Sequence, residues 1–391
     1  MKIKICLLLF ASTTLFAQNL SEIIQALEMS KRVTSMKEQS KSSIAQTKLL
    51  GAYDAPYLGL SISHADESSD KGEEYAVGIS QDISHPFTNK SVAVDAKTKA
   101  IELGSSYNLD MLSLDIAKIY HQACIRKEIS LSLKSLYEEQ NEGYLRLQRA
   151  HALGEISKKE LLFNKLDLAK TKQSVRTYKR AYLAKLSSLN ESVDNLTIND
   201  LACDDLIRIT KEVELKEVQE HALIKKISYE QSSANSFYNV YNSTFSTIGY
   251  ELLYEKELDK DRYTFGLSLP LDFLSSKAQM QRTELMHLDA SLMAKKDALS
   301  IEIQNYLSAS SIRLKALYEE FVVLEEEILP LSLELKDLAK KSLKEGHSSV
   351  LEYLDATRSY TKIVLELQEI KKDYYNELIE LYKKADMRER L

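Results

Sequence analysis

Two hydrophobic periods alternate along the chain and predict two kinds of element. Residues 88–152 place apolar side chains three or four positions apart, which predicts one helix of roughly 100 Å at ~1.5 Å per residue. Residues 20–51 show the same period and predict a shorter helix before it. Residues 57–64 and 75–83 instead alternate apolar with small or polar side chains, which predicts a β-hairpin with the charged segment 66–74 as its loop.

The same order of elements occurs a second time. Residues 246–254 and 263–271 alternate like the first pair of strands, with a charged loop between them. A long helix comes next, and its apolar positions step by three and four, which predicts a coiled-coil seam. Pro330 interrupts this helix and is expected to kink it or open it locally, because proline has no backbone N–H. The seam consists of Leu314, Leu317, Phe321, Leu324, Ile328, Leu331, Leu335 and Leu338.

Two glycine turns mark an internal repeat. Gly154 and Gly346 each interrupt a helical pattern, lie about 190 positions apart, and precede a serine by three residues. A helix is predicted to run back after each turn, and the strands repeat at nearly the same offset. The predicted divisions are a signal peptide (1–17), a first repeat (18–190), a linker or small side element (191–214) and a second repeat (215–391).

The strands of both hairpins are typical of an outer-membrane β-barrel. Each is about ten residues long, with apolar side chains on one face and small or polar ones on the other. A half-buried soluble hairpin would alternate in the same way, but no second sheet is predicted to cover the apolar face. Four strands cannot close a barrel, and lipid excludes an open sheet edge, so several chains would each contribute four strands. The predicted fold class is mostly α with membrane β.

The N-terminus and the net charge narrow the class of protein. Lys2 and Lys4 precede a short apolar run, and residues 15–17 suit cleavage, so a secretory signal peptide is predicted and an anchor helix is the alternative. No later segment approaches a transmembrane helix in length and apolarity. The net charge of −6 argues against nucleic acid as the main partner.

No combination of residues suggests catalysis. The chain has no Gly-rich phosphate loop, no Cys-x-x-Cys and no His-x-x-x-His, and its seven histidines are scattered. His85 and His121 are expected to be surface or lumen residues. We therefore predict no enzymatic activity, no cofactor and no metal site. Energy for any transport would come from a partner.

Two cysteines, Cys124 and Cys203, remain after removal of the signal peptide. The first lies in the middle of a predicted helix and the second in the predicted linker. Buried or free thiols are therefore favoured over a disulfide, although a pair stays open as the alternative.

In this organisation the chain resembles the TolC-like outer-membrane efflux protein family. The resemblance covers the whole mature chain and rests on the duplicated plan, the two glycine turns, and Pro86 and Pro270 after the second strand of each hairpin. Its most recognisable stretch runs from Leu329 to Ala356. It implies an outer-membrane homotrimer with a 12-strand β-barrel, four strands per chain, continued by an α-helical coiled-coil barrel across the periplasm.

The implied function is a passive exit duct of a tripartite efflux or type I secretion system. The two turns would be the periplasmic tips that dock a membrane-fusion adaptor, although ordinary helical hairpin turns would fit the same residues. Glycine allows the chain to reverse at positive φ, and serine can cap the next helix. The docking residues would be Leu153, Gly154, Ser157, Gly346 and Ser349.

The resemblance also implies an acidic gate. Glu352 and Asp355 match family positions where acids line the closed entrance, and Glu160 is the corresponding acid of the first repeat. Rings of like charge in a trimer would raise one another's pKa and attract cations. A solvated helix face is the alternative for these acids, and Asp167 and Tyr353 are weaker candidates.

Two other classes of protein compete with the duct. A periplasmic adaptor would need a β-domain flanking a single hairpin, and a structural coiled coil without a pore would leave the four strands unexplained. The stretch from Pro330 to Gly346 looks more like family members paired with proton-driven RND pumps than with ABC transporters. Nothing in the sequence identifies the cargo.

Overall fold

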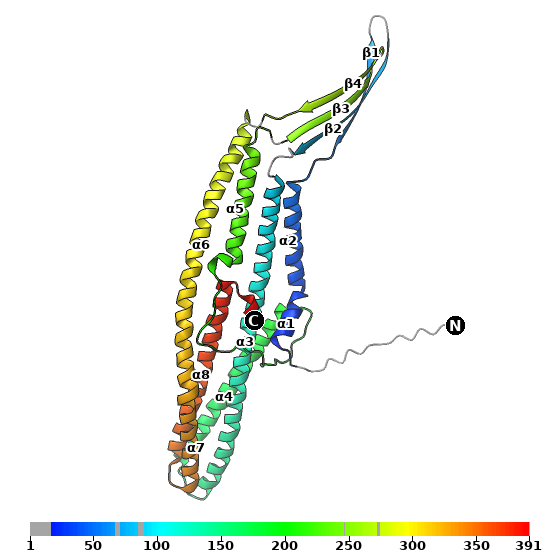
Figure 1. Cartoon of the computed structure of the whole chain (residues 1–391). Helices are drawn as coiled ribbons and strands as arrows, with labels where there is room; N and C mark the ends of the chain where they lie inside the picture. Colours follow the sequence, from blue (N-terminus) through cyan, green and yellow to red (C-terminus); the bar gives the residue numbers. More distant parts are fainter. Residues whose placement is uncertain (1–16, 67–70, 85–89, 246, 272–273, 391) are drawn as a thin grey trace, which may run out of the picture. The chain divides into compact units, whose positions relative to one another are not determined.

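The computed structural model describes residues 17–66, 71–84, 90–245, 247–271 and 274–390 (Figure 1). Most of the predicted signal peptide, and both Pro86 and His85, lie outside these residues. Helices account for most of the described chain. The elements are α1 (Leu20–Glu28), α2 (Lys31–Leu49), β1 (Tyr57–Asp66), β2 (Lys71–Ser84), α3 (Lys90–Ala152), α4 (Lys158–Ser192), α5 (Ala222–Tyr241), β3 (Thr247–Lys256), β4 (Asp261–Ser268), α6 (Ser276–Val322), a π-helical segment (Val323–Ile328), α7 (Leu329–Glu345) and α8 (Val350–Ala385), with short 3₁₀ turns at Val218–Glu220 and Arg388–Arg390.

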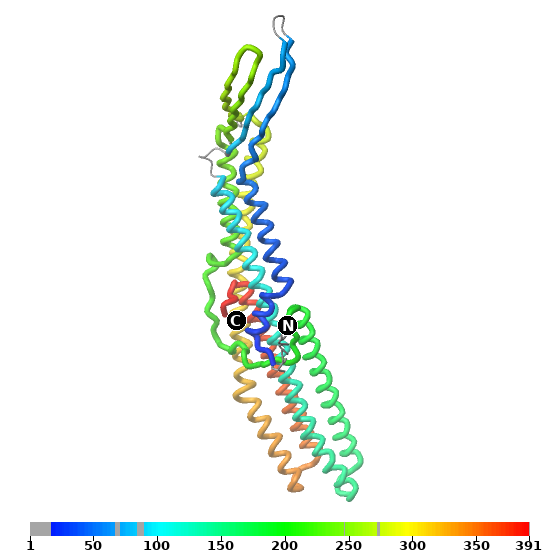
Figure 2. Tube along the Cα trace, turned by 90° about the vertical axis from the view of Figure 1, so that its right-hand side faces the viewer, coloured from blue at the N-terminus to red at the C-terminus, as the bar shows by residue number. Residues whose placement is uncertain are grey.

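The chain forms two compact units, each of which takes segments from both predicted repeats. We call the first the helical unit (Met1–Thr34, Leu109–Leu215 and Asn305–Leu391) and the second the strand unit (Ser35–Asn108 and Lys216–Gln304). In the helical unit, α4, α7 and α8 lie alongside the C-terminal part of α3 (Figures 1 and 2). Among the residues that the structure describes, no helix combines the length and apolarity needed to cross a membrane.

The single helix predicted over residues 20–51 is wrong in one respect, because the structure divides it into α1 and α2. Asn19 and Glu22 form a capping box that starts α1. The helix ends at Glu28, and the N–H of Lys31 donates to both carboxylate oxygens of Asp194 at 3.2 Å. This bond from a distant segment satisfies a donor at the start of α2, where a new helix would otherwise leave it unpaired.

The four strands form one antiparallel sheet in the order β1-β2-β3-β4. Leu58 lies opposite Ile79, Ile79 opposite Leu252, and Leu252 opposite Phe265. Directly opposed residues point to the same face, so these apolar residues share one face, whereas Leu253 lies with Gly78 on the other. This confirms the predicted alternation. The other face bears mainly small and polar residues, among them Gly59, Ser61, Ala76, Gly78, Ser80, Asp82, Glu251 and Glu255.

The apolar face of the sheet is open to solvent in the single chain. Leu58, Leu60 and Ile62 are 67%, 71% and 72% exposed, although they lie in rows that continue across the sheet. β1, β2 and β3 are longer than predicted, because charged residues of the expected loops pair across the strands. Lys71, for example, contacts Asp66 at 2.9 Å. β4 also begins earlier, at Asp261, but it ends at Ser268, three residues before its predicted end.

The long helix of the second repeat changes its winding before Pro330. It is α-helical as far as Val322, π-helical over Val323–Ile328, and α-helical again as α7. A proline ring crowds the carbonyl four residues earlier, and a widened turn relieves that contact. The expected local opening is confirmed. The prediction of one continuous seam is wrong. Phe321 and Leu324 are buried, whereas Leu331, Leu335 and Leu338 are exposed.

Candidate functional site

Both predicted tips are tight turns of the same geometry. Gly154 and Gly346 have φ of 79° and 77°, a left-handed conformation that glycine adopts without steric cost. In each turn the glycine N–H donates to the carbonyl three residues earlier, and the next N–H donates to the carbonyl five residues earlier, at 2.9 to 3.3 Å. These bonds satisfy the last carbonyls of α3 and α7. Leu153, beside the first glycine, is 75% exposed.

The serine after each glycine caps the next helix. Ser157 and Ser349 are the N-caps of α4 and α8, and each forms a capping box with the acid three residues on. The carboxylate of Glu160 accepts from the backbone N–H and the hydroxyl of Ser157, both at 2.8 Å, and these bonds lower its pKa. Glu352 accepts from the N–H of Ser349 at 3.4 Å. Two of the three predicted gate acids therefore also fix the start of a helix.

A cavity of about 470 Å³ is lined by residues of both turns. Leu147 and Val350 supply its apolar wall and form a buried cluster with Leu354, against which Ile156 and Leu343 pack. An apolar wall with a charged rim suits a protein partner. The charged and polar lining comprises Glu139, Glu142, Arg146, Glu155, Glu160, Lys340, Lys344, Ser348 and Ser349.

Asp355 belongs to an ion-pair cluster that joins α8 to α4. Arg358 Nη1 donates to Asp355 at 2.8 Å, and Arg358 Nε donates to Asp167 at 2.8 Å. The side chain of Asp167 is 9% exposed and that of Asp355 is 72% exposed. Removal of Arg358 would leave the buried carboxylate of Asp167 without its charge partner, which costs more free energy than the loss of the exposed pair with Asp355. Sequence reasoning missed Arg358, whose only signal was its position three residues after Asp355.

A second charge cluster joins α7 to α3. Lys336 is 7% exposed, and its Nζ lies 3.1 Å from Glu139 Oε2 and 4.6 Å from the ring centroid of Tyr360. Lys340 also pairs with Glu139. Burial raises the pKa of the Glu139 carboxyl, but the two ammonium groups outweigh it and hold that pKa below its ordinary value.

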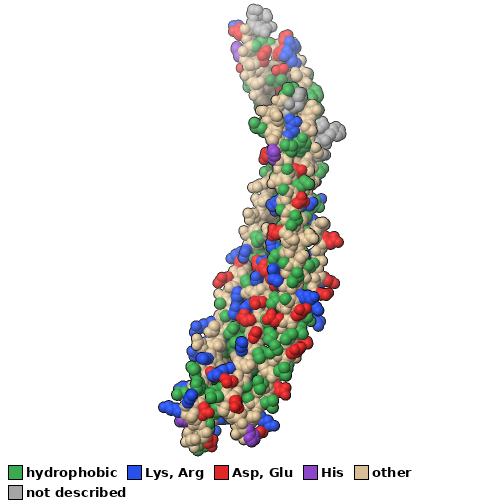
Figure 3. Space-filling model, turned by 90° about the vertical axis from the view of Figure 1, so that its left-hand side faces the viewer, with side chains coloured by type: hydrophobic (Ala, Val, Ile, Leu, Met, Phe, Trp, Pro, Cys, Tyr) green, Lys and Arg blue, Asp and Glu red, His purple; other side chains and the backbone are tan. Residues whose placement is uncertain are grey.

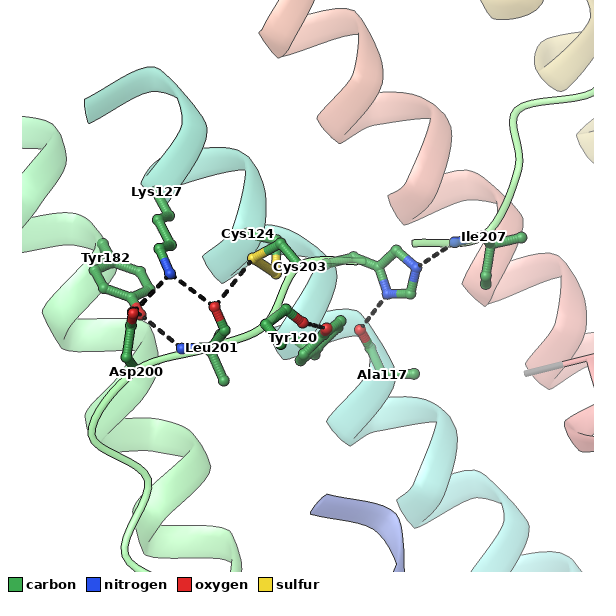
Figure 4. The surroundings of a disulfide bond; sticks show 11 residues. Ala117, Tyr120, Cys124, Lys127, Tyr182, Asp200, Leu201, Cys203 and Ile207 are labelled. Carbon is green, nitrogen blue, oxygen red and sulfur yellow. Dashed lines mark hydrogen bonds and ion pairs between the residues drawn. A yellow bond between two sulfur atoms is a disulfide. The ribbon is translucent and has the colours of Figure 1, made fainter. Parts of the chain in front are cut away.

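The predicted linker is fastened to α3 by a disulfide (Figure 4). Cys124 and Cys203 are bonded, with their Cα atoms 5.5 Å apart, so the preference for free thiols is wrong. The linker lies against the middle of α3, and the two cysteines meet although they are 79 residues apart in sequence.

Polar groups on α3 and α4 hold the same part of the linker (Figure 4). Lys127 donates to the carboxylate of Asp200 at 2.8 Å and to the carbonyl of Leu201 at 2.7 Å. Tyr182 donates to Asp200 at 2.6 Å and accepts from the N–H of Leu201 at 3.2 Å. Tyr374 of α8 bonds both backbone groups of Thr210 further along. The linker is thus a folded part of the helical unit.

His121 is fully buried, which corrects its expected place on the surface or in a lumen. Nδ1 donates to the carbonyl of Ala117 at 2.8 Å, and Nε2 accepts from the N–H of Ile207 at 3.1 Å. An acceptor Nε2 requires a neutral ring. Burial lowers the pKa of His121 to about 4, although its bond to Ala117 acts in the opposite direction. Within the described residues, no group of three or more His, Cys, Asp or Glu side chains is arranged to hold a metal ion.

Solved structures of outer-membrane channels share this fold. The Campylobacter jejuni channel CmeC matches with a TM-score of 0.72 and 14% identity, over 94% of this chain and 85% of that one. The Vibrio cholerae outer membrane protein VceC matches with a TM-score of 0.71 and 13% identity, over 94% of this chain and 95% of that one. The open state of the Neisseria gonorrhoeae channel MtrE matches with a TM-score of 0.73 and 15% identity, over 94% of this chain and 88% of that one. No protein-family model and no curated protein matches the sequence.

The likeness extends over nearly the whole described chain, so it concerns the complete fold. The chain has the fold of these outer-membrane channels, with a four-strand sheet and long helices.

Proposed function

We propose that this protein is a passive exit duct of the outer membrane, which carries substrates from an inner-membrane transporter across the periplasm. The observation that supports this best is the sheet. Its apolar rows run across all four strands and are uncovered, while its other face is small and polar. Such a sheet suits lipid on one side and water on the other.

The sheet supports a homotrimer because it cannot close by itself. Within the described residues, β1 and β4 each pair with one strand only, which leaves two open edges. Three copies would bring twelve strands and join every edge to a neighbour. The residues from Tyr75 to Ile83 that lie on this face of β2 are apolar except for Gln81. They extend ~27 Å along the strand, or ~20 Å along the membrane normal at the usual tilt, close to the ~25 Å apolar band of such barrels.

Within this function, the two turns dock a periplasmic membrane-fusion adaptor. The exposed Leu153 and the cavity beside Gly346 support this role, because a partner's apolar side chain could enter between charged rims. We infer a proton-driven RND pump rather than an ABC transporter as the source of energy. This finer assignment rests on the stretch from Pro330 to Gly346, which looks like that of members paired with such pumps.

The acids near the turns form the gate in this proposal. Glu352 and Asp355 lie one turn of α8 apart and are both exposed, and Glu160 occupies the matching position on α4. Arg358 would hold the entrance narrow by tying Asp355 to the buried Asp167. Three copies would repeat this cluster around one axis and favour cations.

Cell fractionation tests the proposed duct against its alternatives. The mature protein is expected in the outer-membrane fraction as a trimer that migrates differently before and after heating in SDS. A mature protein that stays soluble without detergent would contradict the duct and favour a periplasmic adaptor or a structural coiled coil.

A further inference from the structure

The apolar seam passes from buried to exposed across the π-helical segment. Phe321, just before it, and Leu324, in its first turn, form a buried cluster with Leu367 and Ile370 of α8. After it, Leu331, Leu335 and Leu338 are 65%, 55% and 55% exposed. The spacing of three and four continues without a break in the sequence, so the change arises from the backbone.

A π turn contains one more residue than an α turn, and one extra residue rotates the rest of the helix by about 100° around its axis. The residues that replace the leucines on the inner side are polar. Ser332 and Lys336 are buried there, and Lys336 is neutralised by Glu139. A buried ammonium needs such a partner, so the inward face of α7 is already satisfied within the chain. The exposed leucines form the face of α7 that has no packing partner among the described residues of the chain.

A second exposed stripe lies on α4. Leu162 and Leu166 are 55% and 50% exposed, and Ala169 continues the stripe at the same spacing. We call residues 162, 166 and 169 the α4 stripe, and residues 331, 335 and 338 the α7 stripe. Both stripes belong to the helical unit, and both stay exposed, so they do not cover each other within one chain. Figure 3 shows hydrophobic side chains interspersed with charged ones over one face of the helices.

The two stripes match in distance from their turns. Leu162 lies eight residues after Gly154 and Leu338 lies eight residues before Gly346. Ala169 and Leu331 each lie fifteen residues from the same glycines. At ~1.5 Å per residue, both stripes run from roughly 12 to 23 Å from the tip. One helix runs toward its tip and the other away from it, so the stripes suit antiparallel packing.

The charges beside the stripes are complementary. Lys165 lies three residues after the first member of the α4 stripe, and Glu334 lies three residues after the first member of the α7 stripe. Neither forms an ion pair with any residue that the structure describes, and both are exposed. Charges at such flanking positions set the choice and orientation of partners in coiled coils.

We propose that the π-helical segment transfers the seam from the chain's own α8 to α4 of a neighbouring copy, with the α7 stripe of one chain packed on the α4 stripe of the next. Different surfaces on the two sides make a head-to-tail contact, which closes into a ring when the rotation allows it. This inference rests on the proposed trimer and names the contact that joins its copies near the tips.

A photo-cross-linking residue placed in turn at two seam positions tests the proposal on purified, full-length protein in detergent. p-Benzoylphenylalanine at Leu335 is expected to join two chains, with the second attachment in α4, as mapped by mass spectrometry on mixed isotope-labelled chains. The matched control is Leu317, on the other side of the π-helical segment, which lines a groove with Asp373 and Asn376 of α8. It should cross-link within its own chain. Attachment of Leu335 to its own chain, or to another segment of the second copy, overturns the proposal.

Charge substitution gives a second measurement that does not depend on cross-linking. Leu335→Glu is expected to lower the trimer fraction about tenfold at fixed protein concentration, and Leu166→Lys in the same chain should restore most of it. Leu333→Glu is the control, because Leu333 is also exposed on α7 but lies off the stripe. An equal loss in both glutamate variants, or no rescue, counts against the contact.

The proposed duct and the seam transfer fail on different results. If wild-type protein forms conducting trimers but Leu335 attaches elsewhere, the proposed duct stands and the seam transfer falls. If wild-type protein is monomeric in membranes, the proposed duct fails and the seam transfer fails with it.

Discussion

At the scale of single residues, two glycines set the geometry of the tips. Gly346 has φ of 77°, and an L residue there costs about 1–2 kcal/mol. Gly346→Ala is therefore expected to lower the free energy of unfolding by that amount, as measured by thermal melts of purified protein followed by circular dichroism. Gly143→Ala is the control, because Gly143 lies inside α3 with open space around it and should gain up to about 1 kcal/mol. A loss of the same size in both variants would contradict the assigned turn.

His121 makes the stability of the helical unit depend on pH. Its pKa is lowered from 6.5 to about 4 by burial, so between these values the unfolded chain binds a proton that the folded chain does not. The free energy of unfolding should therefore fall as the pH decreases from 6.5 to 4, by about 3 kcal/mol, with no further loss from this group below pH 4. Denaturant titrations at several pH values would measure this.

The control for that titration is His121→Gln, which keeps polar atoms at the site but does not titrate. The variant is expected to lose stability less steeply over the same pH range, whatever its stability at pH 7. An identical slope in wild type and variant would mean that other groups, such as the paired carboxylates, account for the pH dependence.

Several single residues could not be assigned from the sequence because their partners are distant in it. Arg358 donates to Asp167, which is 191 residues away in sequence, and Cys124 is bonded to Cys203, which is 79 residues away. Glu160 and Glu352 were predicted by analogy as gate acids, and their local role as capping residues was not recognised. That role is readable in principle, because a serine three residues before a glutamate is the signature of a capping box.

At the scale of elements, periodicity predicted the order of helices and strands and the positions of the four strands and the two turns. The division between α1 and α2 was missed because no glycine or proline marks it. The π-helical segment was missed for a different reason. The spacing of three and four continues through it, so only the backbone reveals that the seam has rotated.

The start of α8 is where the gate can be tested. The double variant Glu352→Gln, Asp355→Asn removes two exposed carboxylates and releases Arg358 from Asp355. It is expected to enlarge single-channel conductance and to reduce cation selectivity severalfold in planar bilayers, because in the proposed gate the acids would attract cations and the ion pair would hold the entrance. Glu345→Gln, an exposed acid just before the second turn, is the control. Unchanged conductance and selectivity in the double variant would refute the gate assignment.

At the scale of the whole molecule, a single chain leaves apolar surface and strand edges uncovered. Over the residues that the structure describes, its sheet exposes an apolar face and two edges, and its helices expose two matched apolar stripes. Such surfaces are costly in water and are expected to be covered by lipid and by other copies.

Single-channel recording of the purified mature protein in a planar bilayer tests the proposed duct most directly, with its oligomeric state determined by cross-linking in the same preparation. A trimer that gives small, cation-selective conductance steps is the expected result. A folded protein that inserts without conductance, or that does not insert at all, would contradict the duct.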